Sequence, residues 1–273
     1  MPGLADPAPG SGPAPGHVWL VGAGPGDPGL LTLRAAEALR SAEIVLHDAL
    51  PGTAVLGLAD PRAVLIDVGK RKGHAPWPQA AINARLIAAA RSGLRVVRLK
   101  GGDPFIFGRG GEEALALVEA GIPWRVVPGV SAGLAAPALA GIPLTHRGLS
   151  GAVTFLTGHD AAGDLPSATA LAGTATLVAF MALSRLDALV LAALLAGRDP
   201  ATPLAVIARA GLPGARILRT TLGEATLAAR RARLPGPALM VIGAVAGIAA
   251  LHGAGNASPP TTARPRYSPS APE

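Results

Sequence analysis

The stretch VGAGPGDPGLL, residues 21–31, links two segments of different character. The apolar run at 18–21 before it is typical of a strand, and the segment TLRAAEAL at 32–39 after it is typical of a helix. A buried strand, a glycine-rich turn and a helix in succession form the first part of a β-α-β unit. The stretch therefore predicts an α/β fold with a largely parallel sheet.

The glycines of this stretch also raise the question of a dinucleotide. Gly24, Gly26 and Gly29 fit the G-x-G-x-x-G pattern of NAD- and FAD-binding turns. Pro25 and Pro28 stand between them, and proline has no backbone N–H with which to hold a phosphate. The pattern matches in letters, but its chemistry is poor for a pyrophosphate.

Short apolar runs continue to alternate with helical segments through the first half of the chain. Runs of this kind are typical of strands that are buried on both faces of a sheet. We expect strands at 18–21, 44–46, 64–68, 95–99 and 124–127, and helices at 32–40, 79–92, 111–120 and 131–140.

The rhythm changes after about Arg147, where helices become fewer per strand. This change favours a second, mixed sheet. We expect strands at 153–157, 176–180, 203–208, 216–220 and 238–242, and helices at 184–196 and 222–233.

These patterns predict two α/β domains between two tails. The first domain, with a mainly parallel sheet, is expected at residues 17–148, and the second, with a mixed sheet, at 149–252. Segments 1–16 and 253–273 are rich in Pro, Gly, Ala, Ser or Thr, and this composition predicts disorder.

Composition excludes several kinds of site. The 273 residues include no cysteine, so disulfides, zinc-thiolate sites and thiol nucleophiles are excluded. No basic segment followed by an apolar one opens the chain, and its longest uncharged stretches are broken by proline or too short to span a bilayer. We expect a cytoplasmic protein that does not enter a membrane.

The charge of the chain favours an anionic partner. The net charge is +7, and all but three of the cationic side chains are arginines. A solvated basic surface would explain this equally well. Scattered arginines and only 3% aromatic residues favour a small polyanion over a nucleic acid.

Five loops are expected at the carboxyl ends of the strands of the first sheet, where open α/β sheets bind ligands. They lie at 22–29, 47–48, 69–71, 100–111 and 128–132. The fourth belongs to VVRLKGGDPFIFGRGGEE, residues 96–113, in which a strand leads into two glycines and an aspartate. Glu112 and Glu113 are expected to be favourable charges in the first turn of the following helix.

These segments resemble the tetrapyrrole methylase family. The resemblance rests on VGAGPGDPGLLTLRA (21–35), VGKR (68–71), RLKGGDPFIFGRGGEE (98–113), VVPGVSAG (126–133) and AGIPLTHRG (140–148), in this order. It implies two α/β domains with the active site in the cleft between them.

The resemblance also implies a reaction. This would be the transfer of methyl groups from S-adenosyl-L-methionine to two ring carbons of uroporphyrinogen III. The products would be precorrin-2 and S-adenosylhomocysteine, on the way to sirohaem and cobalamin. A homodimer is implied as well, with no metal, nucleic acid or membrane. The eight carboxylates of that substrate agree with an arginine-rich cleft.

Residue roles come from the same resemblance. Asp48 is implied as proton acceptor and Lys70 as proton donor, while Arg109 is expected to hold a substrate carboxylate. The residues implied to line the methyl-donor site are Pro25, Gly101, Gly102, Asp103, Ile106, Ser131, Ala132, Met181 and Ala210.

Three alternatives remain open at this point. A relative could methylate a later corrin intermediate or ribosomal RNA. The turn at 24–29 could serve an NAD-dependent oxidoreductase in which Asp48 binds the ribose. The chain could also be a nucleotide-binding module without catalysis.

Overall fold

The computed structural model describes residues 12–69, 77–158 and 163–248. Within these ranges it forms two units, each built on a five-stranded sheet. Unit 1 comprises the chain up to Leu139 together with Ala208–Arg216 and Pro235–Leu239, and unit 2 comprises the rest. The domains predicted at 17–148 and 149–252 remain a prediction, because these units are defined by packing and not by independent folding. The disordered tails predicted at 1–16 and 253–273 lie largely outside the described residues.

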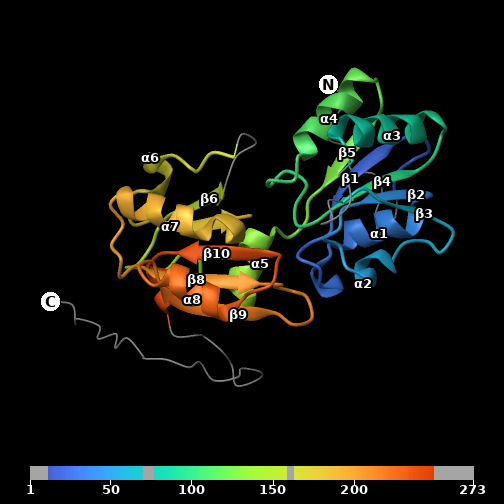
Figure 1. Cartoon of the computed structure of the whole chain (residues 1–273). Coiled ribbons are helices and arrows are strands. Elements are labelled where there is room, and N and C mark those ends of the chain that lie inside the picture. The colour runs from blue at the N-terminus through green and yellow to red at the C-terminus, as the bar shows by residue number, and fades with distance from the viewer. Residues whose placement is uncertain (1–11, 70–76, 159–162, 249–273) are drawn as a thin grey trace. The chain divides into compact units, whose positions relative to one another are not determined.

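The sheet of unit 1 is parallel, as the sequence predicted (Figure 1). Its strand order is β3-β2-β4-β1-β5. The strands are β1 (Val18–Gly22), β2 (Ile44–His47), β3 (Val64–Asp67), β4 (Val96–Lys100) and β5 (Trp124–Val127).

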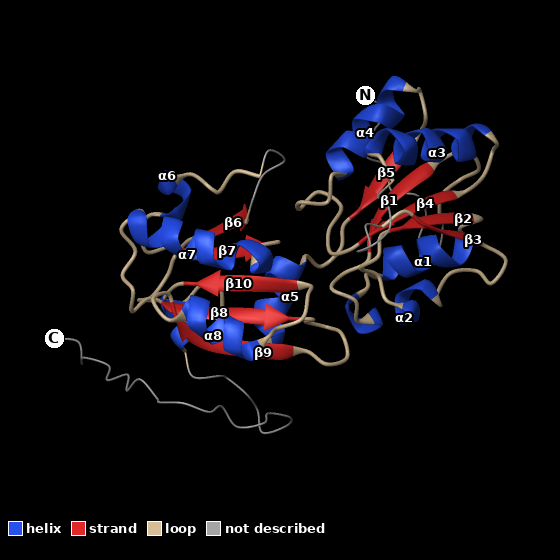
Figure 2. Ribbon diagram, in the orientation of Figure 1, coloured by secondary structure: helices blue, strands red, loops and turns tan. Residues whose placement is uncertain are grey.

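Helices cover both faces of this sheet (Figure 2). One face packs against α3 (Gln79–Arg91) and α4 (Gly110–Glu119), and the other against α1 (Leu33–Ser41) and α2 (Thr53–Leu56). Successive residues of a strand point to opposite faces, so β1 contributes Val18 and Leu20 to one core and Trp19 and Val21 to the other. This is why the strands appear in the sequence as unbroken apolar runs. The remaining elements of unit 1 are the 3₁₀ turn η1 (Pro28–Leu30) and α5 (Ala132–Leu139).

Unit 2 has the mixed sheet that the sequence predicted, in the order β6-β7-β10-β8-β9. Strand β7 pairs parallel with β6 and antiparallel with β10. The strands are β6 (Val153–Thr157), β7 (Thr176–Phe180), β8 (Pro203–Ala208), β9 (Arg216–Thr221) and β10 (Ala238–Ile242). The other elements are α6 (Ala168–Leu171), η2 (Leu183–Arg185), α7 (Leu186–Leu195), α8 (Ala225–Ala232) and η3 (Ala244–Gly247).

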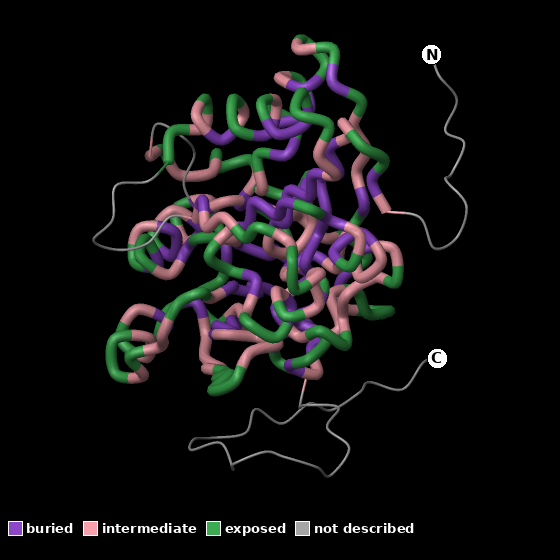
Figure 3. The backbone as a smooth tube through the Cα atoms, turned by 90° about the vertical axis from the view of Figure 1, so that its right-hand side faces the viewer, coloured by how far each residue is buried: buried purple, intermediate pink, exposed green. Residues whose placement is uncertain are grey.

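All ten predicted strands are present. The inner strands of each sheet are almost wholly buried, and the edge strands β3, β5, β6 and β9 are less so. Figure 3 colours the backbone by this burial. The single-turn helices α2 and α6 were not predicted, since four residues are too few to show a helical period. In the described part of the chain, no helix is long and apolar enough to cross a membrane.

Three glycines let the loops of unit 1 meet backbone against backbone at the carboxyl edge of the sheet. A Cβ on Gly129, which follows β5, would stand 2.3 Å from the carbonyl oxygen of Gly102. A Cβ on Gly22 would stand 2.5 Å from the backbone of Gly129. No side chain fits here, so the loops after β1, β4 and β5 depend on glycine for their contact.

We expect Gly129→Ala to lower the free energy of unfolding by about 1–3 kcal/mol, the usual cost of overpacking. Urea denaturation measures this change. Gly111→Ala is the matched control, since nothing lies within 4 Å of its added Cβ and it sits in helix α4. That variant should be neutral or slightly more stable. Equal stability of the two variants would contradict the packing described here.

Candidate functional site

Strand β4 carries two buried cations side by side. Arg98 and Lys100 are two residues apart, so both side chains point to the face covered by α3 and α4. Their side chains are only 3% and 2% exposed. Charged groups this deeply buried require partners, because an unpaired charge away from water is very costly.

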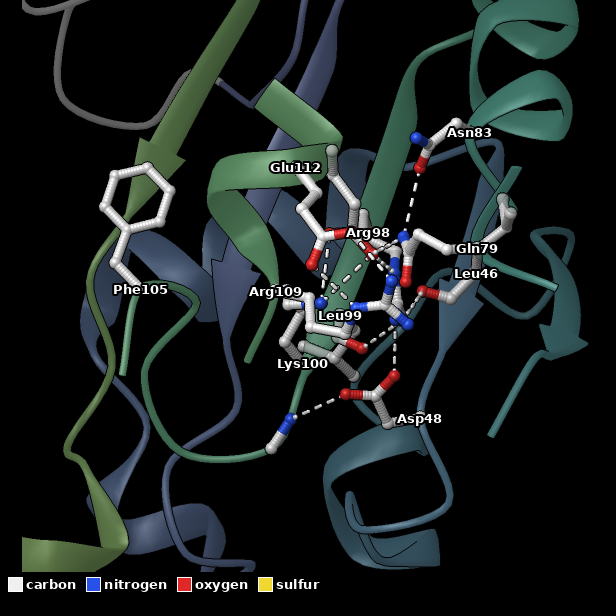
Figure 4. A network of polar contacts seen from close by, with 12 residues as sticks. Leu46, Asp48, Gln79, Asn83, Arg98, Leu99, Lys100, Phe105, Arg109 and Glu112 are labelled. Atoms are coloured by element: carbon white, nitrogen blue, oxygen red, sulfur yellow. Dashed lines mark hydrogen bonds and ion pairs between the residues drawn. The ribbon is translucent and has the colours of Figure 1, made fainter. Parts of the chain in front are cut away.

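Glu113 of α4 is the partner that both cations share. Its carboxylate accepts from Arg98 Nε at 2.9 Å and lies 3.0–3.1 Å from the Nζ of Lys100. Gln79 of α3 adds a third donor at 3.2 Å, and the same Gln79 amide also donates to Asn83 (Figure 4). Glu113 lies in the first turn of α4, as the sequence predicted, and it is fully buried there.

Asp48 lies at the other end of the Arg98 guanidinium. Its Oδ1 accepts a short hydrogen bond from Arg98 Nη2, while Oδ2 is 3.4 Å from the backbone nitrogen of Gly101 (Figure 4). The Nη1 of Arg98 donates to the carbonyls of Leu46 and Leu99. Asp48 is partly exposed, so a network that is buried at Glu113 reaches solvent at Asp48.

The pKa values of the two cations are shifted in opposite directions. Burial acts against the charge of Arg98, but the carboxylates of Asp48 and Glu113 outweigh it and raise the pKa of its guanidinium. Burial, assisted by the neighbouring charge of Arg98, lowers the pKa of the Lys100 ammonium despite the two carboxylates. The network therefore stabilises the positive charge of Arg98 more than that of Lys100.

The glycine-rich turn after β1 uses its N–H groups within the protein. The N–H of Ala23 donates to the carbonyl of Lys100 at 2.7 Å, and Gly24 exchanges two backbone hydrogen bonds with Gly102. Further along, Gly29 donates to the side chain of Asp27 at 2.8 Å. A phosphate cradle needs such groups to point at the ligand. The geometry thus argues against the dinucleotide alternative.

Asp103 joins the loop after β4 to the loop after β5. Its two carboxylate oxygens accept from the N–H of Phe105 at 2.8 Å and from the N–H of Gly129 at 3.1 Å. A Cβ on Gly102 would lie 3.5 Å from the backbone nitrogen of Ala132, which starts α5. The side chain of Ser131 caps the first turn there by accepting from Gly133 N.

The loop between β8 and β9 also belongs to unit 1. A Cβ on Gly211 would lie 3.2 Å from Pro25, and one on Gly26 would overlap the side chain of Leu212. Ala210 is thereby held beside the turn after β1.

Positive backbone φ angles mark several of the same loops. Phe107, Arg109, Met181 and Arg209 have φ between 50° and 59°, a region that side chains other than glycine seldom occupy. Each such residue costs about 1–3 kcal/mol and is typical of a ligand site. Three of the four lie in unit 1, and Met181 follows β7 of unit 2.

The structure brings together most of the residues expected at the site. In unit 1 they lie in the loops at the carboxyl edge of the sheet and in the β8–β9 loop packed against the turn after β1: Pro25, Asp48, Gly101, Gly102, Asp103, Ser131, Ala132 and Ala210. Ile106 is exposed on the loop after β4, and Met181 belongs to unit 2. Lys70 lies outside the described residues.

Arg109 has a partner within the chain. Its guanidinium meets Glu112 in a two-pronged pair at 2.8 and 2.7 Å, and both side chains are about half exposed. The hydrogen bond that Arg109 donates to Glu112 raises the pKa of the Arg109 guanidinium. The residues that sequence reasoning missed are Arg98 and Glu113; the signal was a strand with cations at alternate positions in a sheet expected to be buried on both faces.

Comparison with known proteins agrees with this geometry. The family model for tetrapyrrole (corrin/porphyrin) methylases matches residues 17–226. The chain belongs to this family. In described residues, no group of three or more His, Cys, Asp or Glu side chains is placed to hold a metal ion.

Three members of the family share between 40% and 50% of their aligned residues with this chain. The chain is 50% identical to a uroporphyrinogen-III C-methyltransferase of Sinorhizobium sp. over 84% of each chain. It is 48% identical to siroheme synthase 2 of Halorhodospira halophila, of which it spans only 47%. A uroporphyrin-III C-methyl transferase from Thermus thermophilus, solved with S-adenosylhomocysteine, has 40% identity and a TM-score of 0.74, over 84% of this chain and 98% of the other. These likenesses confirm the family and the fold predicted from the sequence.

We expect Lys100→Met to lower the free energy of unfolding by about 3–5 kcal/mol, because it leaves Arg98 as one cation for the two carboxylates, Asp48 and the buried Glu113. Adding Glu113→Gln restores the balance of charge, so the double variant should lose less than the two single losses added together. Urea denaturation of both single variants and the double variant measures this coupling. Strictly additive losses would show that Lys100 and Glu113 do not act as a pair.

Proposed function

We propose that this chain transfers two methyl groups from S-adenosyl-L-methionine to ring carbons of uroporphyrinogen III. The products are precorrin-2 and S-adenosylhomocysteine. The observation that carries the proposal is the Asp48 carboxylate, which is held at the carboxyl edge of the sheet beside the Gly101-Gly102-Asp103 turn. The likeness to the Sinorhizobium enzyme supports the choice of substrate.

In this reaction a pyrrole carbon bonds to the methyl carbon as the bond from methyl to sulfur breaks, and the electron pair stays on sulfur. The protein's first task is to hold the two reactants in line, which can supply several kcal/mol of barrier lowering. Its second task is to take up the proton that the ring system loses. We assign this proton to Asp48, and the return of a proton to Lys70.

We assign different residues of these loops to the two ligands. Pro25, Gly101, Gly102, Asp103, Ile106, Ser131, Ala132, Met181 and Ala210 are proposed to bind the methyl donor. Arg109 is proposed to bind a carboxylate of the tetrapyrrole, exchanging its exposed partner Glu112 for the substrate. Because that pair is exposed, the exchange costs little.

We also infer a cytoplasmic homodimer. Exposed apolar side chains on α4, Leu115 and Val118, give surface that a second copy would cover. Light scattering in solution tests the assembly.

The test of the reaction is incubation of the chain with S-adenosyl-L-methionine and uroporphyrinogen III under reducing conditions. Mass analysis should find a tetrapyrrole that carries two added methyl groups, each in place of a lost proton, with S-adenosylhomocysteine formed alongside. Methylation of a later corrin intermediate or of RNA, with uroporphyrinogen III left unchanged, would contradict the proposal.

We expect Asp103 and Arg109 to affect different ligands. Loss of a hydrogen bond to a charged group costs about 1.5–3 kcal/mol, so Asp103→Ala should weaken S-adenosylhomocysteine binding about 10-fold or more. Arg109→Lys loses the two-pronged fork and should raise KM for uroporphyrinogen III while leaving that binding intact. Calorimetry measures S-adenosylhomocysteine binding and initial rates measure KM on both variants, so each variant serves as the control for the other. The assignments fail if the two effects are exchanged or if neither appears.

We expect Asp48→Asn to lower kcat by about 10²-fold or more, since it keeps the shape of the side chain and removes its basicity. Binding of S-adenosylhomocysteine should be unchanged. Calorimetry with NAD is the control for the dinucleotide alternative, in which the same change would weaken NAD binding through the ribose. A variant with normal kcat would remove Asp48 from the mechanism.

A further inference from the structure

Glu113 is a buried carboxylate to which the proposed reaction gives no part. Its side chain is 0% exposed, and carboxylates are almost never buried so fully unless they are paired. It receives Arg98 Nε, Lys100 Nζ and Gln79 Nε2, so donors from β4 and α3 fix its place. A carboxylate that accepts from three donors is held in one position, and so are the groups that bind to it.

The guanidinium of Arg98 links the position of Glu113 to that of Asp48 at the edge of the sheet. It is a planar group whose donors stand in a fixed fork. With Nε held on Glu113 and Nη1 held by the carbonyls of Leu46 and Leu99, the direction of Nη2 is determined. Nη2 is the atom that donates to Asp48.

The two oxygens of Asp48 are consequently unlike each other. Oδ1 accepts from Arg98, while Oδ2 meets the backbone nitrogen of Gly101 at the longer distance of 3.4 Å. The side chain is 27% exposed, against 0% for Glu113. Oδ2 is therefore the less engaged of the two oxygens.

We propose that Glu113 is a positioning residue for proton uptake by Asp48: it holds Arg98 in the orientation that presents Oδ2 of Asp48 to the substrate. The inference rests on the proposed function. In the step it serves, a ring C–H bond breaks, its electron pair stays in the ring system, and the proton bonds to Oδ2.

A positioning role and a merely structural role differ in what Glu113→Gln changes. The glutamine keeps the size of the side chain, but its NH2 group cannot accept from Lys100, and the network gains a positive charge. If Glu113 positions Arg98, kcat should fall about 10- to 100-fold, as for other small misplacements near the chemistry, with S-adenosylhomocysteine binding unchanged. Glu119→Gln, the same change at the exposed end of the same helix, is the matched control and should turn over normally.

The decisive comparison uses Asp48→Asn as background. If Glu113 acts through Asp48, adding Glu113→Gln to Asp48→Asn should lower kcat by less than about threefold further, because the base it positions is already gone. If Glu113→Gln lowered kcat by the same factor in Asp48→Asn as in the unaltered chain, Glu113 would act elsewhere than through Asp48. That result would overturn the inference.

Folding is controlled with the charge-balanced variant. Lys100→Met combined with Glu113→Gln should recover stability relative to Lys100→Met, yet keep the low kcat of Glu113→Gln. Recovery of kcat together with stability would reduce Glu113 to a structural role and overturn the inference. Absence of methyl transfer by the unaltered chain would instead contradict the proposed function, and the inference with it, whereas an active chain with a fully active Glu113→Gln variant contradicts the inference alone.

Discussion

A carboxylate with no access to water is the constraint on which unit 1 depends. Glu113, at the start of α4, is paired with two cations that β4 supplies on the facing side of the sheet. Each buried charge here requires the others, since the loss of one leaves an uncompensated charge in a medium that screens poorly. Strand β4, helix α4 and the loop between them are therefore fixed as one piece, and this loop carries Asp103 and Arg109.

The network also links the interior to the edge of the sheet. Arg98 has carboxylates on two sides, one fully buried and one partly exposed. The strand order places β4 between β2 and β1, so Asp48, Gly101 and the turn after β1 meet at one edge although they are far apart in sequence. Topology thus turns three separate loops into one candidate site.

Much of the fold could be predicted from local pattern, and the candidate site only in part. The strands were predictable because a sheet covered on both faces requires unbroken apolar runs, and the site loops because parallel strands share a carboxyl edge. Glu113 was not, because a glutamate in the first turn of a helix has the same local pattern whether it faces water or Arg98. The packing of Leu212 against Gly26 was beyond local pattern too, since it depends on a tertiary return of the chain.

The bridge between Gly24 and Gly102 has a consequence for redesign and for evolution. It commits main-chain donors of the turn after β1 to another loop of the same protein. Side-chain substitutions leave main-chain donors where they are, so exchanges around this turn would not by themselves turn it into a pyrophosphate site. A change of ligand class at this turn would first require the two loops to separate, and that separation is opposed by the hydrogen bond from Ala23 N to the carbonyl of Lys100 as well. The glycine pattern matches that of a nucleotide-binding turn in sequence, but the hydrogen bonds that these glycines make in the structure hinder its conversion into one.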